Sequence, residues 1–126
     1  MAYDIEITKE FRFDAAHRLP QMPAGHPYTR MHGHSFRVAV TLSGTPDPTK
    51  GWITDFAEID RVLAGLRDEL DHMTLNEIPG LENPTLEIIA RWIFERAAQS
   101  LPGLRLVSLY RDSIGESCTV RAAKLQ

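Results

Sequence analysis

Hydrophobic and polar residues alternate along two stretches in the first third of the chain. In residues 3–16 the apolar side chains occupy odd positions, with mostly charged residues between them: Ile5, Ile7, Phe11, Phe13 and Ala15. A second alternating stretch covers His34–Leu42, and its apolar residues share one parity: Phe36, Val38, Val40 and Leu42. A period of two is typical of a strand with one buried face, so we expect two strands here.

Helical spacing replaces the alternation after residue 54. Asp55 is the expected N-cap of a first helix ending near Leu70, with Glu58 as its capping-box partner. Its apolar stripe comprises Phe56, Ile59, Val62, Leu63, Leu66 and Leu70. A second helix is expected to open at Asn83-Pro84-Thr85, with Pro84 in the first turn, and to stop at residues 101–103. Its expected buried face comprises Leu86, Ile89, Ala90, Ile93, Phe94 and Ala97.

Two further apolar stretches, Leu104–Tyr110 and Cys118–Ala122, predict closing strands. The order strand, strand, helix, helix, strand, strand predicts an α+β fold, with an antiparallel four-stranded sheet and both helices on one face. We expect a single domain over residues 1–126. The other face of the sheet then needs cover, and further subunits are one way to supply it.

Composition narrows the classes of function. The formal net charge of −3 gives no basic footprint for nucleic acid, and no apolar run approaches the length of a membrane span. The N-terminal residues alternate and carry charge, so we expect neither a signal peptide nor a transit peptide. The single cysteine, Cys118, fits a reducing cytoplasm and excludes a cysteine-cluster metal site. A metal ion would need His, Asp or Glu ligands.

Three histidines have the placement of metal ligands. His32 and His34 flank Gly33, and residues two apart on a strand point to the same side. His17 ends the first predicted strand, so a hairpin-like return would bring it beside them. Three neutral imidazoles suit Zn²⁺ and leave a fourth position open for catalysis. The alternative is a chance His-x-His next to an ordinary hydrogen-bonded histidine, and the pattern alone leaves both open.

A further histidine, His72, follows Asp71 at the end of the first predicted helix. A carboxylate beside an imidazole orients it and favours proton transfer near neutral pH. The alternative is a structural role, because a charged histidine also interacts favourably with a helix C-terminus. His26 lies in a loop rich in proline and glycine and is expected to be exposed.

Five segments together resemble the 6-pyruvoyl-tetrahydropterin synthase family, and within it the bacterial 6-carboxytetrahydropterin synthases of the queuosine precursor pathway. They are FDAAH (13–17), HGHSF (32–36), GWITDF (51–56), LDHMTLN (70–76) and GLENPTLE (80–87). The resemblance implies the tunnelling fold (T-fold), in which subunits join their sheets into a barrel, usually a homohexamer built as a dimer of trimers. It also implies a zinc ion held by His17, His32 and His34.

The resemblance further implies a cytoplasmic lyase with active sites between subunits. The expected reaction converts 7,8-dihydroneopterin triphosphate to 6-carboxytetrahydropterin with loss of triphosphate and acetaldehyde. Asp71 and His72 would then move protons at a zinc ion bound by a neighbouring subunit. The pterin ring would be held by an acidic residue of the third strand, here Asp112, and by Thr85 and Glu87 at the start of the second helix.

Two positions depart from the family pattern. The family's second proton carrier is a cysteine four residues before HGH, and here that residue is Tyr28. The ring anchor is usually glutamate, whereas Asp112 is one methylene shorter, which leaves Glu116 as a second candidate. The alternatives are therefore a divergent zinc enzyme cleaving another pterin side chain by an aldolase-like reaction, and a non-catalytic pterin-binding protein. Candidate residues for a triphosphate are all basic: Lys9, Arg18, Arg30 and Arg37.

Overall fold

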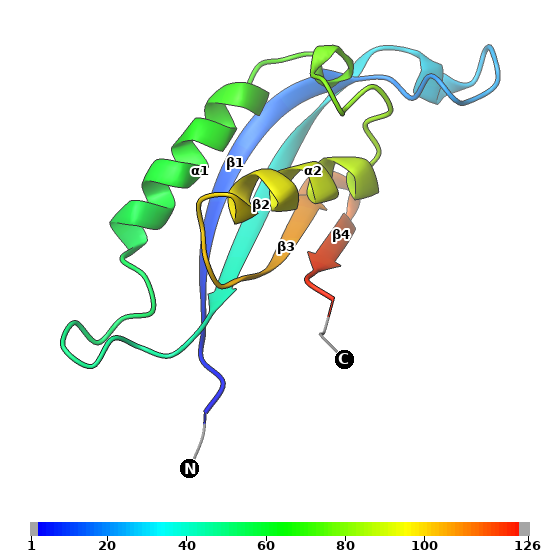
Figure 1. Cartoon of the computed structure of the whole chain (residues 1–126). Helices are drawn as coiled ribbons and strands as arrows, with labels where there is room; N and C mark the ends of the chain where they lie inside the picture. Colours follow the sequence, from blue (N-terminus) through cyan, green and yellow to red (C-terminus); the bar gives the residue numbers. More distant parts are fainter. Residues whose placement is uncertain (1–2, 124–126) are drawn as a thin grey trace.

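Four antiparallel strands in the order β1-β2-β3-β4 form the sheet in the computed structural model, which describes residues 3–123 (Figure 1). The strands are β1 (Glu6–His17), β2 (His32–Ser43), β3 (Leu104–Arg111) and β4 (Glu116–Arg121). Two helices, α1 (Phe56–Leu70) and α2 (Leu86–Ala98), lie between β2 and β3 in the chain. The predicted α+β fold is confirmed, although β2 and β4 each begin two residues earlier than expected.

Both helices pack on one face of the sheet, where their apolar stripes meet the inward-facing strand residues (Figure 1). The fully buried large side chains in this layer include Phe13, Phe36, Leu42, Ile59, Leu70, Ile89, Ile93 and Leu109. Phe56 is an exception to the expected stripe, because it lies exposed at the start of α1. The core therefore occupies the space between the helix pair and the sheet.

The helix starts differ in detail from the sequence prediction. Asp55 caps α1 by accepting a hydrogen bond from the backbone N–H of Ala57 at 2.9 Å, but Glu58 pairs with Arg61 instead of completing a capping box. Thr85 is the N-cap of α2, so Pro84 precedes the helix rather than lying in its first turn. That shift leaves the Pro84 carbonyl available to the side chain of a neighbouring strand.

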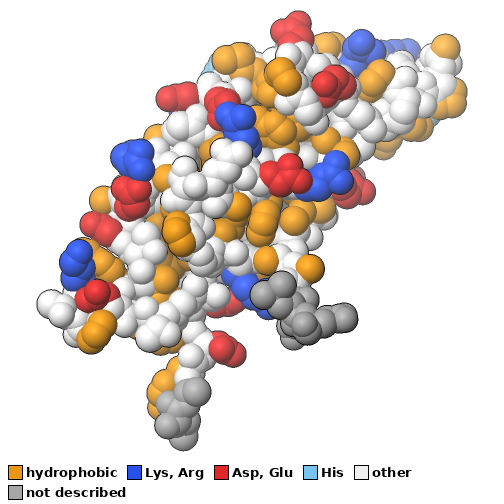
Figure 2. Space-filling view, viewed as in Figure 1, with side chains coloured by type: hydrophobic (Ala, Val, Ile, Leu, Met, Phe, Trp, Pro, Cys, Tyr) orange, Lys and Arg blue, Asp and Glu red, His pale blue; other side chains and the backbone are white. Residues whose placement is uncertain are grey.

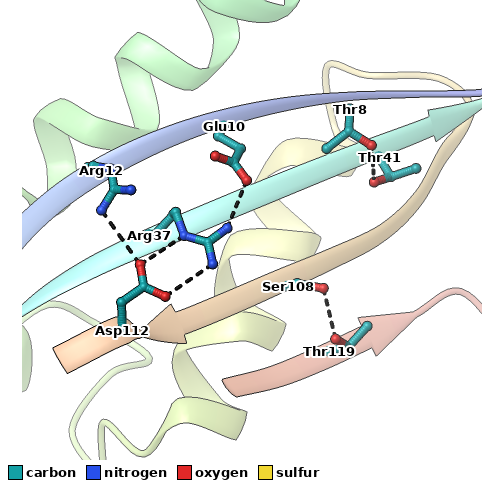
Figure 3. Close-up of polar contacts among 8 residues, drawn as sticks. All are labelled: Thr8, Glu10, Arg12, Arg37, Thr41, Ser108, Asp112 and Thr119. Atoms are coloured by element: carbon teal, nitrogen blue, oxygen red, sulfur yellow. Dashed lines mark hydrogen bonds and ion pairs between the residues drawn. The ribbon is translucent and has the colours of Figure 1, made fainter. Parts of the chain in front are cut away.

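The opposite face of the sheet is polar, and no helix of residues 3–123 covers it. Figure 3 shows hydroxyl pairs across neighbouring strands, Thr8 with Thr41 and Ser108 with Thr119, each at 2.8 Å. On the same face Arg37 donates hydrogen bonds to Glu10 and to Asp112. The structure thus leaves one sheet face and the outer edge of β4 without cover from the described chain, whereas residues 67–74 line part of the outer edge of β1.

The helix-bearing side carries acidic and basic side chains interspersed with apolar ones, and no continuous basic area appears on this face of the described residues (Figure 2). Among residues 3–123, neither helix has the length and apolar content needed to cross a bilayer.

Candidate active site

Three histidines converge where β1 ends and β2 begins. The strand register places His17 opposite His32 and Ala15 opposite His34, so all three imidazoles project from the helix-bearing face. Their ring centroids are 4.6 to 5.0 Å apart. One ligand atom from each ring lies within 4.8 Å of the other two. The convergence predicted from the sequence is confirmed.

The hydrogen bonds of these rings favour a metal ion. His17 Nδ1 lies 2.9 Å from the Pro84 carbonyl oxygen, and His32 Nδ1 lies 2.8 Å from that of Arg30. A carbonyl only accepts, so each Nδ1 carries the proton and each Nε2 keeps a free lone pair. The Nε2 atoms of His17 and His34 are buried and have no hydrogen-bond partner among residues 3–123. Unpartnered buried nitrogens are rare, and a shared zinc ion would satisfy them.

Burial also keeps two of these rings neutral. Removal from water lowers the pKa of both His17 and His34 to about 4, and the positive charge of Arg111 contributes to the lowering in each. Since metal ions bind the neutral imidazole, these rings are in their ligating form near pH 7 without the loss of a proton.

Asp71 and His72 are held at the outer edge of β1 by the segment that follows α1. The Asp71 carboxylate accepts hydrogen bonds from the backbone N–H of Asp14 and from His72 Nδ1, both at 2.9 Å, and it pairs with Arg67 at 3.1 Å. These contacts, led by the Asp14 N–H, lower the pKa of Asp71, so it stays a carboxylate. Its side chain is only 14% exposed. The pairing of the two residues predicted from the sequence is therefore present.

The His72 imidazole projects outward. Its backbone φ of 61° lies in the left-handed region, which non-glycine residues rarely adopt, and its side chain is 79% exposed. The hydrogen bond from its N–H to the Asp14 carbonyl, at 2.6 Å, and a parallel bridge between Ala16 and Thr74 fix this conformation. A hollow of about 430 Å³ lies beside it, lined in part by Gly33.

A second hollow, of about 210 Å³, borders the histidine cluster itself. It is lined by Leu19, Tyr28, His34, Arg111, Ile114 and Glu116. Tyr28 reaches it from the short helix η1 (Pro27–Thr29), where the Tyr28 N–H donates to His26 Nδ1 at 3.1 Å and the two rings pack edge to face. The Tyr28 side chain is thus brought into one hollow with the metal-ligand candidate His34.

Arg111 is a site residue that the sequence analysis missed. It pairs across the β3–β4 hairpin with Glu116, Nη2 to Oε1 at 2.7 Å, while its Nε is buried without a hydrogen-bond partner among residues 3–123. The signal was present in the sequence, because Arg111 shares the parity of the buried residues Val107 and Leu109. That parity places its side chain on the histidine side of the sheet.

Asp112 lies on the opposite face. Its carboxylate accepts hydrogen bonds from Arg37 Nε at 2.9 Å and Nη2 at 3.1 Å, and lies 3.6 Å from Arg12 (Figure 3). The hydrogen bonds from Arg37 lower the pKa of Asp112. The structure therefore does not bring Asp112 together with the histidines, and Glu116 is the candidate anchor that it places near them.

Of the remaining predicted residues, some lie near the histidines and others lie away from them. The Thr85 hydroxyl accepts from the Ile88 N–H at 3.2 Å and follows Pro84, which bonds to His17, whereas Glu87 is exposed one residue into α2. Among the basic candidates, Lys9 pairs with Asp60 at 3.3 Å and Arg37 is engaged on the opposite sheet face. Arg18 and Arg30 are exposed in the loop between β1 and β2.

Comparison with known proteins agrees with this arrangement. The family model of 6-pyruvoyl tetrahydropterin synthase matches residues 6–123. The chain belongs to this family. Within the family, it is 39% identical over 122 residues to 6-carboxy-5,6,7,8-tetrahydropterin synthase from Synechocystis, covering 92% of this chain and 89% of that protein. It is 40% identical over 104 residues to dihydroneopterin monophosphate aldolase from Pyrococcus furiosus, covering 80% and 84% of the respective chains.

Solved structures of the family show the same fold. The structure of 6-pyruvoyl tetrahydropterin synthase from Caenorhabditis elegans superposes with a TM-score of 0.86 at 22% identity, covering 96% of this chain and 97% of the other. The tunnelling fold predicted from the sequence is therefore confirmed for the single chain. Family membership together with the histidine cluster makes this protein a pterin enzyme of the lyase or aldolase type.

Proposed function

We propose that this protein is a zinc-dependent lyase that converts 7,8-dihydroneopterin triphosphate to 6-carboxytetrahydropterin, with release of triphosphate and acetaldehyde. The observation that carries the proposal is the cluster of His17, His32 and His34, whose ligand atoms lie within 4.8 Å of one another beside a hollow lined by His34. The similarity to a synthase along nearly the whole chain supports this choice of reaction. The cytoplasmic location expected from the single cysteine stays a prediction.

The three histidines would hold the zinc ion and leave one coordination position open toward the hollow. When bound there, zinc supplies Lewis-acid polarisation of the side-chain hydroxyls and stabilises negative charge that develops on them. The chain's own contribution is a fixed set of neutral donors. The Pro84 and Arg30 carbonyls fix the tautomers of His17 and His32, so neither of these two rings must reorient when the ion binds.

His72 is the proposed proton carrier, and Asp71 is its positioning residue. Asp71 accepts from Nδ1 and so leaves His72 Nε2 free to take a proton from the substrate or return it. Because the imidazole projects from the sheet edge into solvent, we propose that it serves the zinc site of a neighbouring subunit in a homohexamer. The uncovered sheet face and the open edge of β4 support such an assembly.

Glu116 is the carboxylate that we propose as ring anchor, and we propose that Thr85 and Glu87 at the start of α2 assist it. A carboxylate accepts paired hydrogen bonds from the ring N–H and amino groups. Asp112, the first candidate from the sequence, would need to release Arg37 and move to the other face of the sheet.

A second candidate function is the aldolase-like cleavage of a phosphorylated dihydroneopterin side chain, and Tyr28 is the residue that favours it. A phenol ionises less readily than a thiol, so near neutral pH less of it is available as the ionised base that removes a proton from carbon. Retro-aldol cleavage needs only removal of a hydroxyl proton, breakage of the neighbouring carbon–carbon bond, and return of a proton to the ring-conjugated carbon. The 40% identity to an aldolase supports this alternative.

Product analysis tests the two candidates. The zinc-loaded protein is incubated separately with 7,8-dihydroneopterin triphosphate and monophosphate, and the products are identified by mass. 6-Carboxytetrahydropterin from the triphosphate supports the synthase, whereas a hydroxymethyl pterin from the monophosphate supports the aldolase. If neither compound yields a product, both candidate reactions are contradicted, and a pterin-binding protein without catalysis is left.

The Tyr28→Cys substitution separates a synthase with an altered proton carrier from an aldolase. For a synthase we expect a gain of about tenfold or more in turnover of the triphosphate, because a thiol restores a group that ionises near neutral pH. Tyr28→Phe is the matched control, since it keeps the ring and removes only the hydroxyl. A gain in both variants would mean that loss of the phenol hydroxyl, and not the new thiol, raises turnover.

A further inference from the structure

Arg111 and Glu116 form a cation–carboxylate pair in the wall of the hollow beside His34. The pair closes the β3–β4 hairpin, and the Arg111 side chain is only 16% exposed. Within residues 3–123 its Nε has no hydrogen-bond acceptor. A guanidinium has five N–H donors, and each donor that is buried without an acceptor costs free energy. Contacts inside the described chain therefore leave the hydrogen bonding of Arg111 incomplete.

The pair offers donors and acceptors side by side. Arg111 uses Nη2 for Glu116, which leaves its other N–H groups for a ligand. The ionised Glu116 carboxylate has about four acceptor positions, so accepting from Arg111 leaves others open. A ligand edge that matches this wall would present one acceptor next to two donors.

A 2-amino-4-oxo pteridine has such an edge, because its 4-oxo oxygen accepts while N3–H and the 2-amino group donate. We propose that Arg111 is a specificity-determining residue that donates to the 4-oxo oxygen, while Glu116 accepts from N3–H and the 2-amino group. This inference rests on the proposed function, in which the hollow receives the pterin ring. It makes the pair, and not a lone carboxylate, the group that selects the ring.

A guanidinium also binds phosphate, but the neighbouring carboxylate argues against that role here. Glu116 lies 2.7 Å from Arg111 and would repel a phosphate placed on the same guanidinium. The same carboxylate completes the recognition of a pterin edge, because the ring presents N–H donors to it whereas a phosphate presents only negative charge.

Equilibrium binding to two matched ligands tests the proposal without requiring turnover. The probes are 6-hydroxymethylpterin and 2,4-diamino-6-hydroxymethylpteridine, which differ in the group at position 4 and in the resulting hydrogen at N3. Dissociation constants are measured by fluorescence titration of the purified zinc-loaded protein. We expect wild type to prefer the pterin by about tenfold or more, since the 4-amino group places a donor against Arg111.

Substitutions assign the preference to Arg111. Arg111→Met is expected to weaken pterin binding by about 10- to 100-fold and to reduce the preference to the part that Glu116 supplies through N3–H, while Arg111→Lys keeps more of it. Arg91→Met, which removes an exposed arginine of α2, is the matched control and is expected to bind as wild type does. Zinc content and thermal unfolding of each variant check that the fold is retained.

Several outcomes would overturn the proposal. It fails if wild type does not discriminate between the two ligands, or if Arg111→Met or Arg111→Lys keeps the full preference. It also fails if Arg111→Met weakens dihydroneopterin monophosphate but not 6-hydroxymethylpterin, because Arg111 then binds phosphate. If wild type binds neither pterin compound, the proposed function itself fails. If Arg111→Met does not fold, the proposal is judged by comparing the preference for the pterin in wild type with that in Arg111→Lys.

Discussion

His72 adopts a left-handed backbone conformation, which hydrogen bonds to neighbouring residues stabilise. A left-handed φ of 61° is unfavourable for a histidine, yet the bonds to Asp14 and Asp71 hold it there with the imidazole exposed. The imidazole is exposed and is held at Nδ1 by Asp71, so its Nε2 is free to meet a substrate, which favours the role of proton carrier over a purely structural one.

Replacing His72 by Ala is expected to lower kcat by about 10²- to 10⁴-fold, because the proposed proton carrier is removed. Zinc content should stay at the wild-type level, since His72 is not among the three ligand candidates. Steady-state kinetics on whichever phosphorylated dihydroneopterin is turned over, together with zinc analysis, check this. Turnover within a factor of two of wild type would exclude His72 from the chemistry.

Single residues also mark the limit of sequence-based prediction. The spacing of His32 and His34 identified the cluster because strand parity is preserved along β2. Beyond Arg111 that parity is broken by the short helix η3 (Asp112–Ile114) and by Gly115, whose φ is 67°. Asp112 consequently falls on the opposite face from Glu116, although both positions are even. The parity of β3 could place Asp112, but it could not place Glu116, which follows the break.

At the scale of elements, the connection between α2 and β3 depends on a close backbone approach. Gly103 has a φ of 84°, and a Cβ added there would lie 2.7 Å from the Ser43 carbonyl oxygen at the end of β2. The Ser43 N–H also donates to the Gly103 carbonyl at 2.9 Å. This contact joins the end of β2 to the start of β3, so it helps to hold the sheet register.

The Gly103→Ala substitution is expected to reduce the free energy of unfolding by about 2–5 kcal/mol, from the left-handed backbone and the steric overlap together. Gly51→Ala is the matched control, because its φ is 82° but a Cβ there meets no atom within 4 Å. Its expected cost is about 1–2 kcal/mol. Urea unfolding of both variants measures the difference, and equal costs would show that the contact with Ser43 is unimportant.

The elements themselves were largely predictable, whereas their contacts were not. Alternation and helical spacing located the four strands and two helices to within a few residues. The parallel bridge between Ala16 and Thr74 had no such signal, because residues 71–74 have no apolar period. Yet this bridge and the adjacent hydrogen bonds position Asp71 and His72 against β1.

At the scale of the whole molecule, the sheet carries its metal-ligand candidates on one face and a polar network on the other. The proposed homohexamer places the zinc ligands of one subunit opposite the Asp71–His72 pair of the next. The sequence predicted the uncovered face from the order of its elements. The number and arrangement of subunits come only from the family resemblance, since one chain's pattern does not encode a symmetry operator.

Mixing two inactive variants tests shared active sites. His32→Ala lacks a zinc ligand and His72→Ala lacks the proton carrier, so each alone should be inactive. After dissociation and reassembly as an equal mixture, about a quarter of the sites should combine both intact parts and recover activity. Unmixed variants treated identically are the control, and a mixture that stays inactive while forming mixed oligomers would place both parts in one subunit.

Metal analysis of the purified protein tests the central claim, that His17, His32 and His34 share one zinc ion. We expect about one zinc per chain in wild type purified without chelators, close to none in His34→Ala, and the wild-type amount in His26→Ala. His26 is the matched control because it lies outside the cluster. No zinc in wild type, or the same zinc content in His34→Ala as in wild type, would contradict the account.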